Sequence, residues 1–125
     1  MHGFIHIILK ESLKYIPVIG QGMMFYGFIF LARNWAKDKP RFIHRLSKLA
    51  KMGSESPMWL MIFPEGTNLS DNGRANSTKY AKKIGIEDYR HVLLPRTTGL
   101  QFCLEHLHTS VEWMYDCTVA YEGIP

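Results

Sequence analysis

Apolar residues occur in short runs that are separated by polar stretches and by turn residues. Residues 4–9, 28–31 and 58–63 are almost entirely apolar, and Pro64 stops the last of these runs. Runs of four to eight apolar residues bounded by turn signals are typical of strands buried on both faces. We expect two further strands, at residues 92–94 and in the alternation of Tyr115, Cys117, Val119 and Tyr121.

Helical spacing appears between these runs. Residues 39–51 form the clearest helix, because Phe42, Leu46 and Leu49 make an apolar stripe, and Gly53 and Pro57 should end it. A turn is predicted at Asn72-Gly73. A second helix follows it, with one face that points to the core, and ends at Gly85. A third helix has Thr97 or Thr98 as its N-cap. Their faces are Ser77, Tyr80, Ala81 and Ile84, and Leu100, Cys103, Leu104 and Leu107.

Strands and helices therefore alternate, which predicts an α/β fold with a central, mostly parallel or mixed sheet and covering helices. A short helical turn is expected at residues 10–15. The chain of 125 residues has the size of one domain or part of one. It begins in a strand and stops with nothing to close its last element, so we expect residues 1–125 to be a partial domain cut at both ends.

Residues 15–32 contain no charged side chain, and 18 residues nominally reach the length of a transmembrane helix. This stretch is interrupted by turn and polar residues, so we interpret it as a buried turn–helix–strand passage, with partial entry into lipid as the alternative. The interrupting residues are Pro17, Gly20, Gln21, Gly22 and Gly27.

The net charge of +4 favours anionic partners, but no nucleic-acid-binding module is recognisable and nucleic acid is not expected. Arg41, Arg45 and Lys48 form a basic stripe that is either a solvated helix face or a contact for anionic lipid headgroups. Two cysteines do not suggest a disulfide scaffold, so we expect Cys103 and Cys117 to be small core residues of a protein in a reducing compartment. No metal-ligand cluster is visible in the sequence.

The sharpest local feature is the turn Phe63-Pro64-Glu65-Gly66-Thr67-Asn68 after an apolar strand. Pro64 ends the sheet ladder, and Gly66 permits a positive φ and close approach of the backbone to a ligand. A turn at the carboxyl end of a strand lies where α/β sheets bind ligands. On its own, this pattern is also compatible with a simple turn.

Three further blocks accompany this turn in order: Lys10 to Gly20, Gly27 to Arg33 (G-x-x-F-x-x-R) and Leu94-Pro95-Arg96-Thr97-Thr98-Gly99-Leu100. The set resembles the second, third and fourth motifs of the glycerophospholipid acyltransferase family, which includes the 1-acylglycerol-3-phosphate acyltransferases. It looks most like the branch of lysocardiolipin and lysophosphatidylinositol acyltransferases. The resemblance covers essentially the whole chain.

The family's first motif, N-H-x-x-x-x-D, supplies a general base and the Asp that orients it. None of the six histidines fits it; His6 with Glu11 is a near miss, but Ile5 precedes His6 and a structural role is expected. No catalytic residue is therefore found. Because the motif precedes the first strand in the family, we expect a truncation and not a substitution.

The resemblance implies that Arg33 binds the acceptor's phosphate and that Glu65, Gly66, Thr67 and Asn68 complete the acceptor site. Because a carboxylate repels phosphate, Glu65 should pair with a cation or accept from a glycerol hydroxyl, while Gly66 and Thr67 donate to phosphate oxygens. Asn68 stands where many members have Arg, which favours a phosphodiester acceptor, lysophosphatidylinositol or lysocardiolipin, over lysophosphatidic acid.

Pro95, Arg96 and Gly99 match the fourth motif, which the family reading links to the acyl donor; a simple helix cap is the alternative. The implied activity is transfer of a fatty acyl group from acyl-CoA, as co-substrate, to a lysophospholipid, with no bound cofactor or metal. A membrane surface, at the endoplasmic reticulum or mitochondria, is the implied location. The competing hypothesis is a non-catalytic remnant or a truncated gene model that at most binds phospholipid headgroups.

Overall fold

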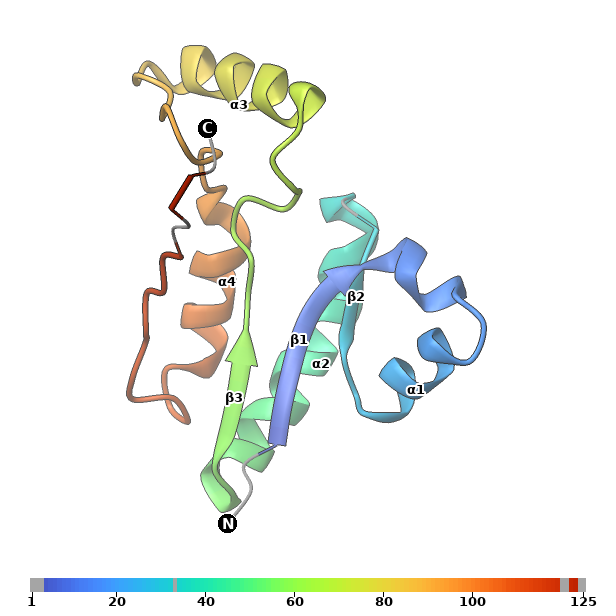
Figure 1. Cartoon of the computed structure of the whole chain (residues 1–125). Helices are drawn as coiled ribbons and strands as arrows, with labels where there is room; N and C mark the ends of the chain where they lie inside the picture. Colours follow the sequence, from blue (N-terminus) through green and yellow to red (C-terminus); the bar gives the residue numbers. More distant parts are fainter. Residues whose placement is uncertain (1–3, 33, 120–121, 124–125) are drawn as a thin grey trace.

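The computed structural model describes residues 4–32, 34–119 and 122–123, so the predicted site residue Arg33 lies outside the described residues. The elements follow one another as strand β1 (Phe4–Lys10), 3-10 helix η1 (Glu11–Tyr15), helix α1 (Ile19–Phe25), strand β2 (Ile29–Leu31), helix α2 (Trp35–Glu55), strand β3 (Met58–Met61), helix α3 (Asp71–Ile84) and helix α4 (Thr97–Leu107) (Figure 1).

The first strand lies at the centre of a three-stranded sheet with the order β2-β1-β3. Both pairings are parallel: Ile8 lies beside Ile29, and Ile5 lies beside Trp59. This confirms the predicted α/β fold and the parallel form of its sheet. The carboxyl ends of all three strands therefore meet at one edge, the upper edge in Figure 1.

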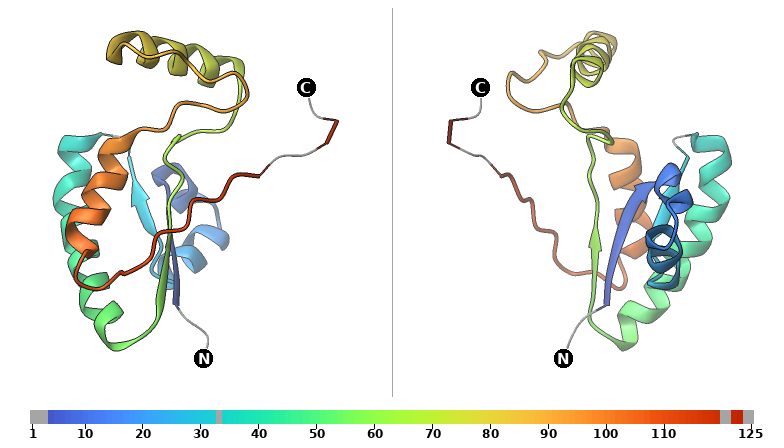
Figure 2. Two further views of the ribbon diagram at one scale, coloured as in Figure 1. Left: turned by 90° about the vertical axis from the view of Figure 1, so that its left-hand side faces the viewer. Right: turned by 45° about the vertical axis from the view of Figure 1, so that its right-hand side comes forward.

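The core lies between the sheet and helices α2 and α4, which cover one face (Figure 2). The predicted stripe of α2 is fully buried at Phe42 and Leu46. The ring of Phe42 stacks on Phe102 of α4 at 5.6 Å, and Trp35 meets Phe102 edge-on at 4.9 Å. Such aromatic contacts join the two helices as well as burying apolar area.

The opposite face of the sheet is open over much of β1 and β3 in the part of the chain that the structure describes. Burial alternates along β3, and Trp59 and Phe63 on the open side are each 57% exposed. Residues 111–119 run beside the β3 edge of the sheet without forming the predicted strand (Figure 1), and the ring of Tyr115 lies 5.6 Å from that of Trp59. Tyr121 lies outside the described residues.

Helix α2 is longer at both ends than its sequence pattern predicts. It begins at Trp35 with Asn34 as N-cap, whose side chain accepts a hydrogen bond from the Lys37 N–H, and it contains Pro40. Proline lacks the N–H for the helical ladder, and because Pro40 is the sixth helical residue the helix forgoes one hydrogen bond, to the Ala36 carbonyl. Gly53 was expected to end the helix and instead lies inside it, so that prediction is wrong.

Two local predictions after β3 are also wrong. Asn72-Gly73 is not a turn but part of the first turn of α3, whose N-cap Ser70 accepts from the Gly73 N–H at 3.1 Å. Residues 92–94 form no strand, although Leu93 and Leu94 are buried. These residues are apolar because they pack against α3. A short apolar run has the same appearance in sequence whether it packs against a helix or pairs in a sheet. Gly85 caps α3 with φ 74°, as predicted.

The uncharged stretch at residues 15–32 is not the buried passage that its composition suggests. In α1 only Gly20 is buried, whereas Phe25 is 93% exposed and Val18, before the helix, is 80% exposed. The rest of the stretch does enter the fold, because Ile29 in β2 belongs to the core. Among the described residues, no helix combines the length and apolar character needed to cross a membrane.

Candidate functional site

The predicted acceptor turn follows β3 at the carboxyl edge of the sheet. The Gly66 N–H donates to the Phe63 carbonyl at 3.0 Å and closes a tight turn that has Pro64 and Glu65 at its centre. Gly66 has φ +71°, so the positive φ expected from the sequence is confirmed. Since its N–H closes the turn, Gly66 in this structure is not poised to donate to a phosphate oxygen.

A backbone hydrogen bond joins this turn to the fourth block. The Arg96 N–H donates to the Pro64 carbonyl at 2.9 Å, across more than thirty residues of sequence. Arg96 is also the N-cap residue of α4, so the predicted cap at Thr97 or Thr98 is wrong; Thr97 is already the first helical residue. Gly99 lies in the first turn of α4, and Pro95 is half-buried beside Arg96.

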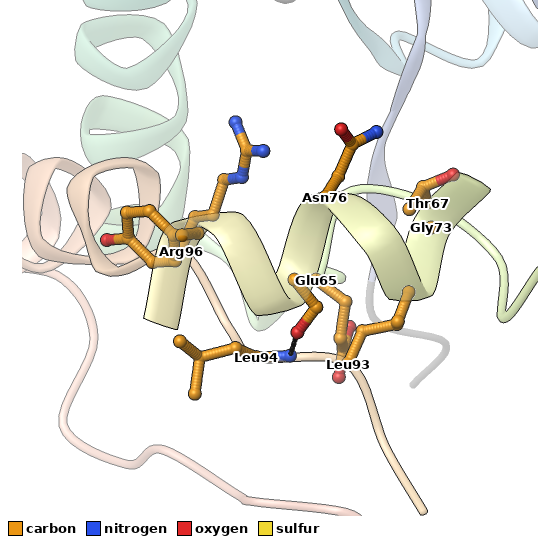
Figure 3. A pocket seen from close by; sticks show the side chains of 9 residues that line it. Glu65, Thr67, Gly73, Asn76, Leu93, Leu94 and Arg96 are labelled. Atoms are coloured by element: carbon orange, nitrogen blue, oxygen red, sulfur yellow. Dashed lines mark hydrogen bonds between the residues drawn. The ribbon is translucent and has the colours of Figure 1, made fainter. Parts of the chain in front are cut away.

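Glu65, Thr67 and Arg96 line one small pocket against α3 (Figure 3). Its volume of about 20 Å³ is room for about one water molecule. In Figure 3 the guanidinium of Arg96, the amide of Asn76 and the hydroxyl of Thr67 all lie on the same side of α3. Two of these three groups were found by motif; Asn76 was not, because only the helix fold brings it beside the turn.

The charge of Arg96 is partly engaged within this region. Its guanidinium carbon lies 5.6 Å from the centre of the Tyr80 ring, which also lines the pocket. A cation over an aromatic face is attracted without losing all its hydration. Arg96 therefore keeps N–H donors for an anion while Tyr80 limits where its side chain can lie.

A network of side-chain hydrogen bonds joins helix α3 to residues 88–94, the segment that precedes α4. This network was not predicted from the sequence. The Ser77 hydroxyl donates to Asp88 at 2.6 Å and accepts from the Leu94 N–H at 2.9 Å, while Thr78 donates to the other Asp88 oxygen at 2.8 Å. The Arg74 guanidinium donates to the carbonyls of Tyr89, Arg90 and Val92. These bonds hold one wall of the pocket.

The same network perturbs one carboxyl group. The hydrogen bond from Ser77, helped by Thr78, Tyr89 N–H and Arg74, holds the pKa of Asp88 below its usual value against the opposing effect of burial. Each of these partners favours the ionised carboxylate. Asp88 is thus a structural anion and not a candidate general base near neutral pH.

The buried carboxylate of Asp38 binds the backbone near the start of α2. Asp38 is 7% exposed and accepts hydrogen bonds from the N–H groups of Ala32, at 2.9 Å, and Asn34, at 3.1 Å. These two residues flank Arg33 in the sequence. Sequence reasoning missed Asp38 because the acid lies in a run of charged residues that resembles an ordinary solvated helix start.

The histidine nearest to the family's catalytic pattern is structural, as expected. His6 is 6% exposed, and its Nδ1 lies 3.3 Å from the Gly27 carbonyl; since a carbonyl only accepts, Nδ1 carries the proton. Its Nε2 is buried without a partner. No histidine is among the described residues that line the pocket at Glu65.

Comparison with known proteins agrees with these features. Residues 2–121 match the family described as Acyltransferase. The chain is 38% identical over 151 residues to the 2-acyl-1-lysophosphatidylinositol acyltransferase of Saccharomyces cerevisiae, covering 96% of this chain and 38% of that protein. It is 43% identical over 122 residues to lysocardiolipin acyltransferase 1 of Gallus gallus, covering 95% of this chain and 32% of that protein.

A third relative is 1-acyl-sn-glycerol-3-phosphate acyltransferase 2 of Arabidopsis thaliana, which is 36% identical over 112 residues, covering 90% of this chain and 28% of that protein. No solved structure matches the chain significantly. The chain spans about a third of the length of the relatives it matches. The match over nearly all its residues places the chain in the glycerophospholipid acyltransferase family.

Proposed function

We propose that this chain supplies the acceptor-binding part of an enzyme that transfers a fatty acyl group from acyl-CoA to a lysophospholipid. In that reaction the acceptor hydroxyl attacks the thioester, a C–O bond forms, the C–S bond breaks, and the hydroxyl proton passes through a base to the CoA thiolate. The enzyme would work at a membrane surface, of the endoplasmic reticulum or of mitochondria.

The observation that carries the proposal is the joining of two separate blocks at one pocket. The bond from Arg96 N–H to the Pro64 carbonyl brings the acceptor turn beside the fourth block, and Thr67, Asn76 and Arg96 present donors on the same side of α3. Such a set suits phosphate oxygens, for which charge-assisted hydrogen bonds are the strong ones. Arg33, which the family resemblance assigns to the acceptor's phosphate, would add the second cation.

The acceptor is proposed to be a phosphodiester, of the lysophosphatidylinositol or lysocardiolipin type. Asn68 brings no charge, and Glu65 adds a negative one beside Arg96. A diester with one negative charge needs fewer cations than a phosphomonoester with nearly two. Pro95 and Gly99 would serve the acyl donor, because they lie next to Arg96 at the start of α4.

The proposal is tested by binding of water-soluble headgroups to the full chain, measured by calorimetry. Glycerophosphoinositol should bind more tightly than glycerol 3-phosphate. Arg96→Ala should weaken binding about tenfold or more, as expected for loss of a charge-assisted bond, whereas Lys79→Ala, an exposed change on α3, should have no effect. Equal binding by the two variants would contradict the assigned site.

Acyl transfer distinguishes the enzyme from the competing hypothesis. No histidine of the chain fits the family's catalytic pattern, so the 125 residues alone should not acylate any acceptor. A version that carries additional upstream sequence with an N-H-x-x-x-x-D motif should transfer the acyl group. Headgroup binding without transfer by that longer version would favour the non-catalytic remnant.

A further inference from the structure

An exposed group of large apolar side chains surrounds η1 and α1, and we call it the apolar cap. Phe25 is 93% exposed and Val18 is 80% exposed, more than any other large apolar side chain given for the described residues. Leaving such side chains in water is unfavourable by about 25 cal/mol per Å². The cap consists of Tyr15, Ile16, Val18, Ile19, Met24, Phe25 and Tyr26.

The cap is a defined structure and not a loose loop. Val18 has φ 63° and ψ −56°, and the Ile19 N–H donates to the Pro17 carbonyl at 2.6 Å, which together define a γ-turn with positive φ. That conformation is strained for a β-branched residue. Gly20 packs so closely on η1 that an added Cβ would lie 2.2 Å from the Lys14 carbonyl oxygen. The fold thus holds Val18 at an exposed tip at an energetic cost.

A basic groove lies directly beside the cap. It separates η1 and α1 from the first half of α2, has a volume of about 540 Å³, and contains Met24 of the cap together with Lys14, Arg41 and Arg45. The acid in the groove, Glu11, lies 3.9 Å from Lys14 and 3.6 Å from Arg41, so it offsets part of the charge. His44 also lines the groove, which keeps a net positive charge.

We propose that the apolar cap enters the interfacial region of a lipid bilayer, with the basic groove facing anionic headgroups. Two tyrosines flank an aliphatic and phenylalanine tip, an arrangement that suits the boundary between water and lipid. Residues 15–32 contain no charge that lipid would have to desolvate. The cations beside the cap complement anionic lipid more directly than they would an apolar protein surface.

This inference deepens the proposed function, and rests on it for its purpose, because a lysophospholipid acceptor lies in the membrane. The cap is on the opposite side of β2 from β1, whereas the pocket at Glu65 lies beyond β3 (Figure 1). The two can therefore be tested separately. Loss of membrane binding by cap variants should leave binding of glycerophosphoinositol unchanged.

The first test is flotation of the full chain with vesicles of phosphatidylcholine containing phosphatidylglycerol. Phe25→Asp should reduce the vesicle-bound fraction at least tenfold, since a fully inserted phenylalanine becomes a charge. The matched control is Trp113→Asp, because Trp113 is 73% exposed on the segment after α4, which lies beyond β3 and away from the cap. Equal loss in the two variants would overturn the proposal.

Val18→Gly separates insertion from folding. Glycine adopts positive φ without strain, so this variant should unfold at the same or a higher urea concentration than the wild type. It should nevertheless bind vesicles severalfold more weakly, because the apolar tip is gone. Undiminished binding by this folded variant would contradict insertion of the tip.

The charge component is tested with Arg41→Gln combined with Arg45→Gln. Each cation near an anionic surface contributes about fivefold, so the double change should lower binding to anionic vesicles roughly 25-fold while leaving the weaker binding to pure phosphatidylcholine unchanged. Lys79→Gln with Lys82→Gln on α3 is the control. If the α3 pair had the larger effect, or if wild type bound neither vesicle, the assigned face would be wrong.

Discussion

At the scale of single residues, Asp38 connects the core helix to the proposed phosphate-binding position. One carboxylate oxygen accepts from Ala32 N–H and the other from Asn34 N–H, and the side chain is almost entirely buried. A buried carboxylate is tolerated when its oxygens are hydrogen-bonded. Asp38 thereby fixes the backbone at Ala32 and Asn34, the two sequence neighbours of the proposed phosphate ligand Arg33.

Asp38→Ala should destabilise the chain by about 1–3 kcal/mol, because two backbone N–H groups lose their acceptors. Urea unfolding followed by circular dichroism measures this change. Glu112→Ala, at an exposed position outside the helices, should change stability by less than about 0.5 kcal/mol. The same Asp38 variant should weaken headgroup binding; stability and binding both equal to those of the Glu112 variant would refute the positioning role.

The two cysteines should differ sharply in reactivity. Cys103 is 4% exposed in the core, and burial raises the pKa of its thiol to about 12, whereas Cys117 is exposed. Only the thiolate reacts with alkylating reagents. At pH 8, iodoacetamide should label Cys117 at least about 100-fold faster than Cys103, as read by mass spectrometry. In urea the two rates should converge; fast labelling of Cys103 in the folded chain would contradict its burial.

Among the elements, α3 depends on side-chain hydrogen bonds more than on apolar packing. Its buried residues are small, Gly73, Ser77 and Ala81, and an added Cβ at Gly73 would lie 2.8 Å from the Asn68 carbonyl oxygen. Ser77 and Arg74 instead tie the helix to residues 88–94. Loss of those bonds would release the pocket wall while the sheet and α2 stayed folded.

Acid should test this attachment. Because the pKa of Asp88 is lowered in the folded state, its contribution to stability is fully present above the pKa of the unfolded chain and is lost as the pH falls through the folded value. The wild type should therefore lose stability more steeply than Asp88→Asn below about pH 4. Between pH 5 and 7 the stabilities of the wild type and of Asp88→Asn should change with pH in parallel. Urea unfolding at each pH measures this; parallel curves at all pH values would contradict the prediction.

Sequence periodicity predicted the helices better than the segments between them. The stripe of Phe42, Leu46 and Leu49 marked α2 correctly because all three residues enter one core. The apolar run at 92–94 was misread because Leu93 and Leu94 are buried against a helix, where no backbone pairing is needed. The turn signal Asn72-Gly73 failed because Ser70 caps a helix over it.

The candidate site was predicted only where the chain is locally constrained. The turn at Glu65 and Gly66 follows from proline, glycine and the end of a strand, all of which are visible in sequence. Asn76 and Ser77 reach the site through tertiary contacts, whereas Asp38 bonds to backbone N–H groups four and six residues before it. All three residue types are ordinary in exposed helices. Arg33 stays a prediction, because it lies outside the described residues.

At the scale of the whole molecule, the chain exposes far more surface than its mass requires. Its accessible surface is 10156 Å², whereas a folded monomer of 14.5 kDa has about 6,900 Å² by the usual scaling. Part of this excess is apolar, on the open sheet face at Trp59 and Phe63 and on the apolar cap. Contiguous apolar area of this kind binds lipid, protein or other copies of the chain.

In water without detergent the chain should therefore self-associate. Size-exclusion chromatography with light scattering should give masses well above 14.5 kDa, and mild detergent or phosphatidylcholine micelles should shift the chain toward one copy per particle. Trp59→Ser with Phe63→Ser should reduce association more than Lys79→Ser with Lys82→Ser. A monodisperse monomer with a cooperative thermal transition in plain buffer would contradict this expectation.

The central place of β1 in the sheet affects how the protein is made. β1 leaves the ribosome before both of its partners, so Ile8 must wait for Ile29, and Phe4 must wait for Met58, before its two edges are paired. Until α2 and β3 have followed, an apolar strand with an open edge is available to neighbouring nascent chains. Translation pauses between residues 31 and 58 should therefore raise the yield of aggregated product more than pauses after residue 61.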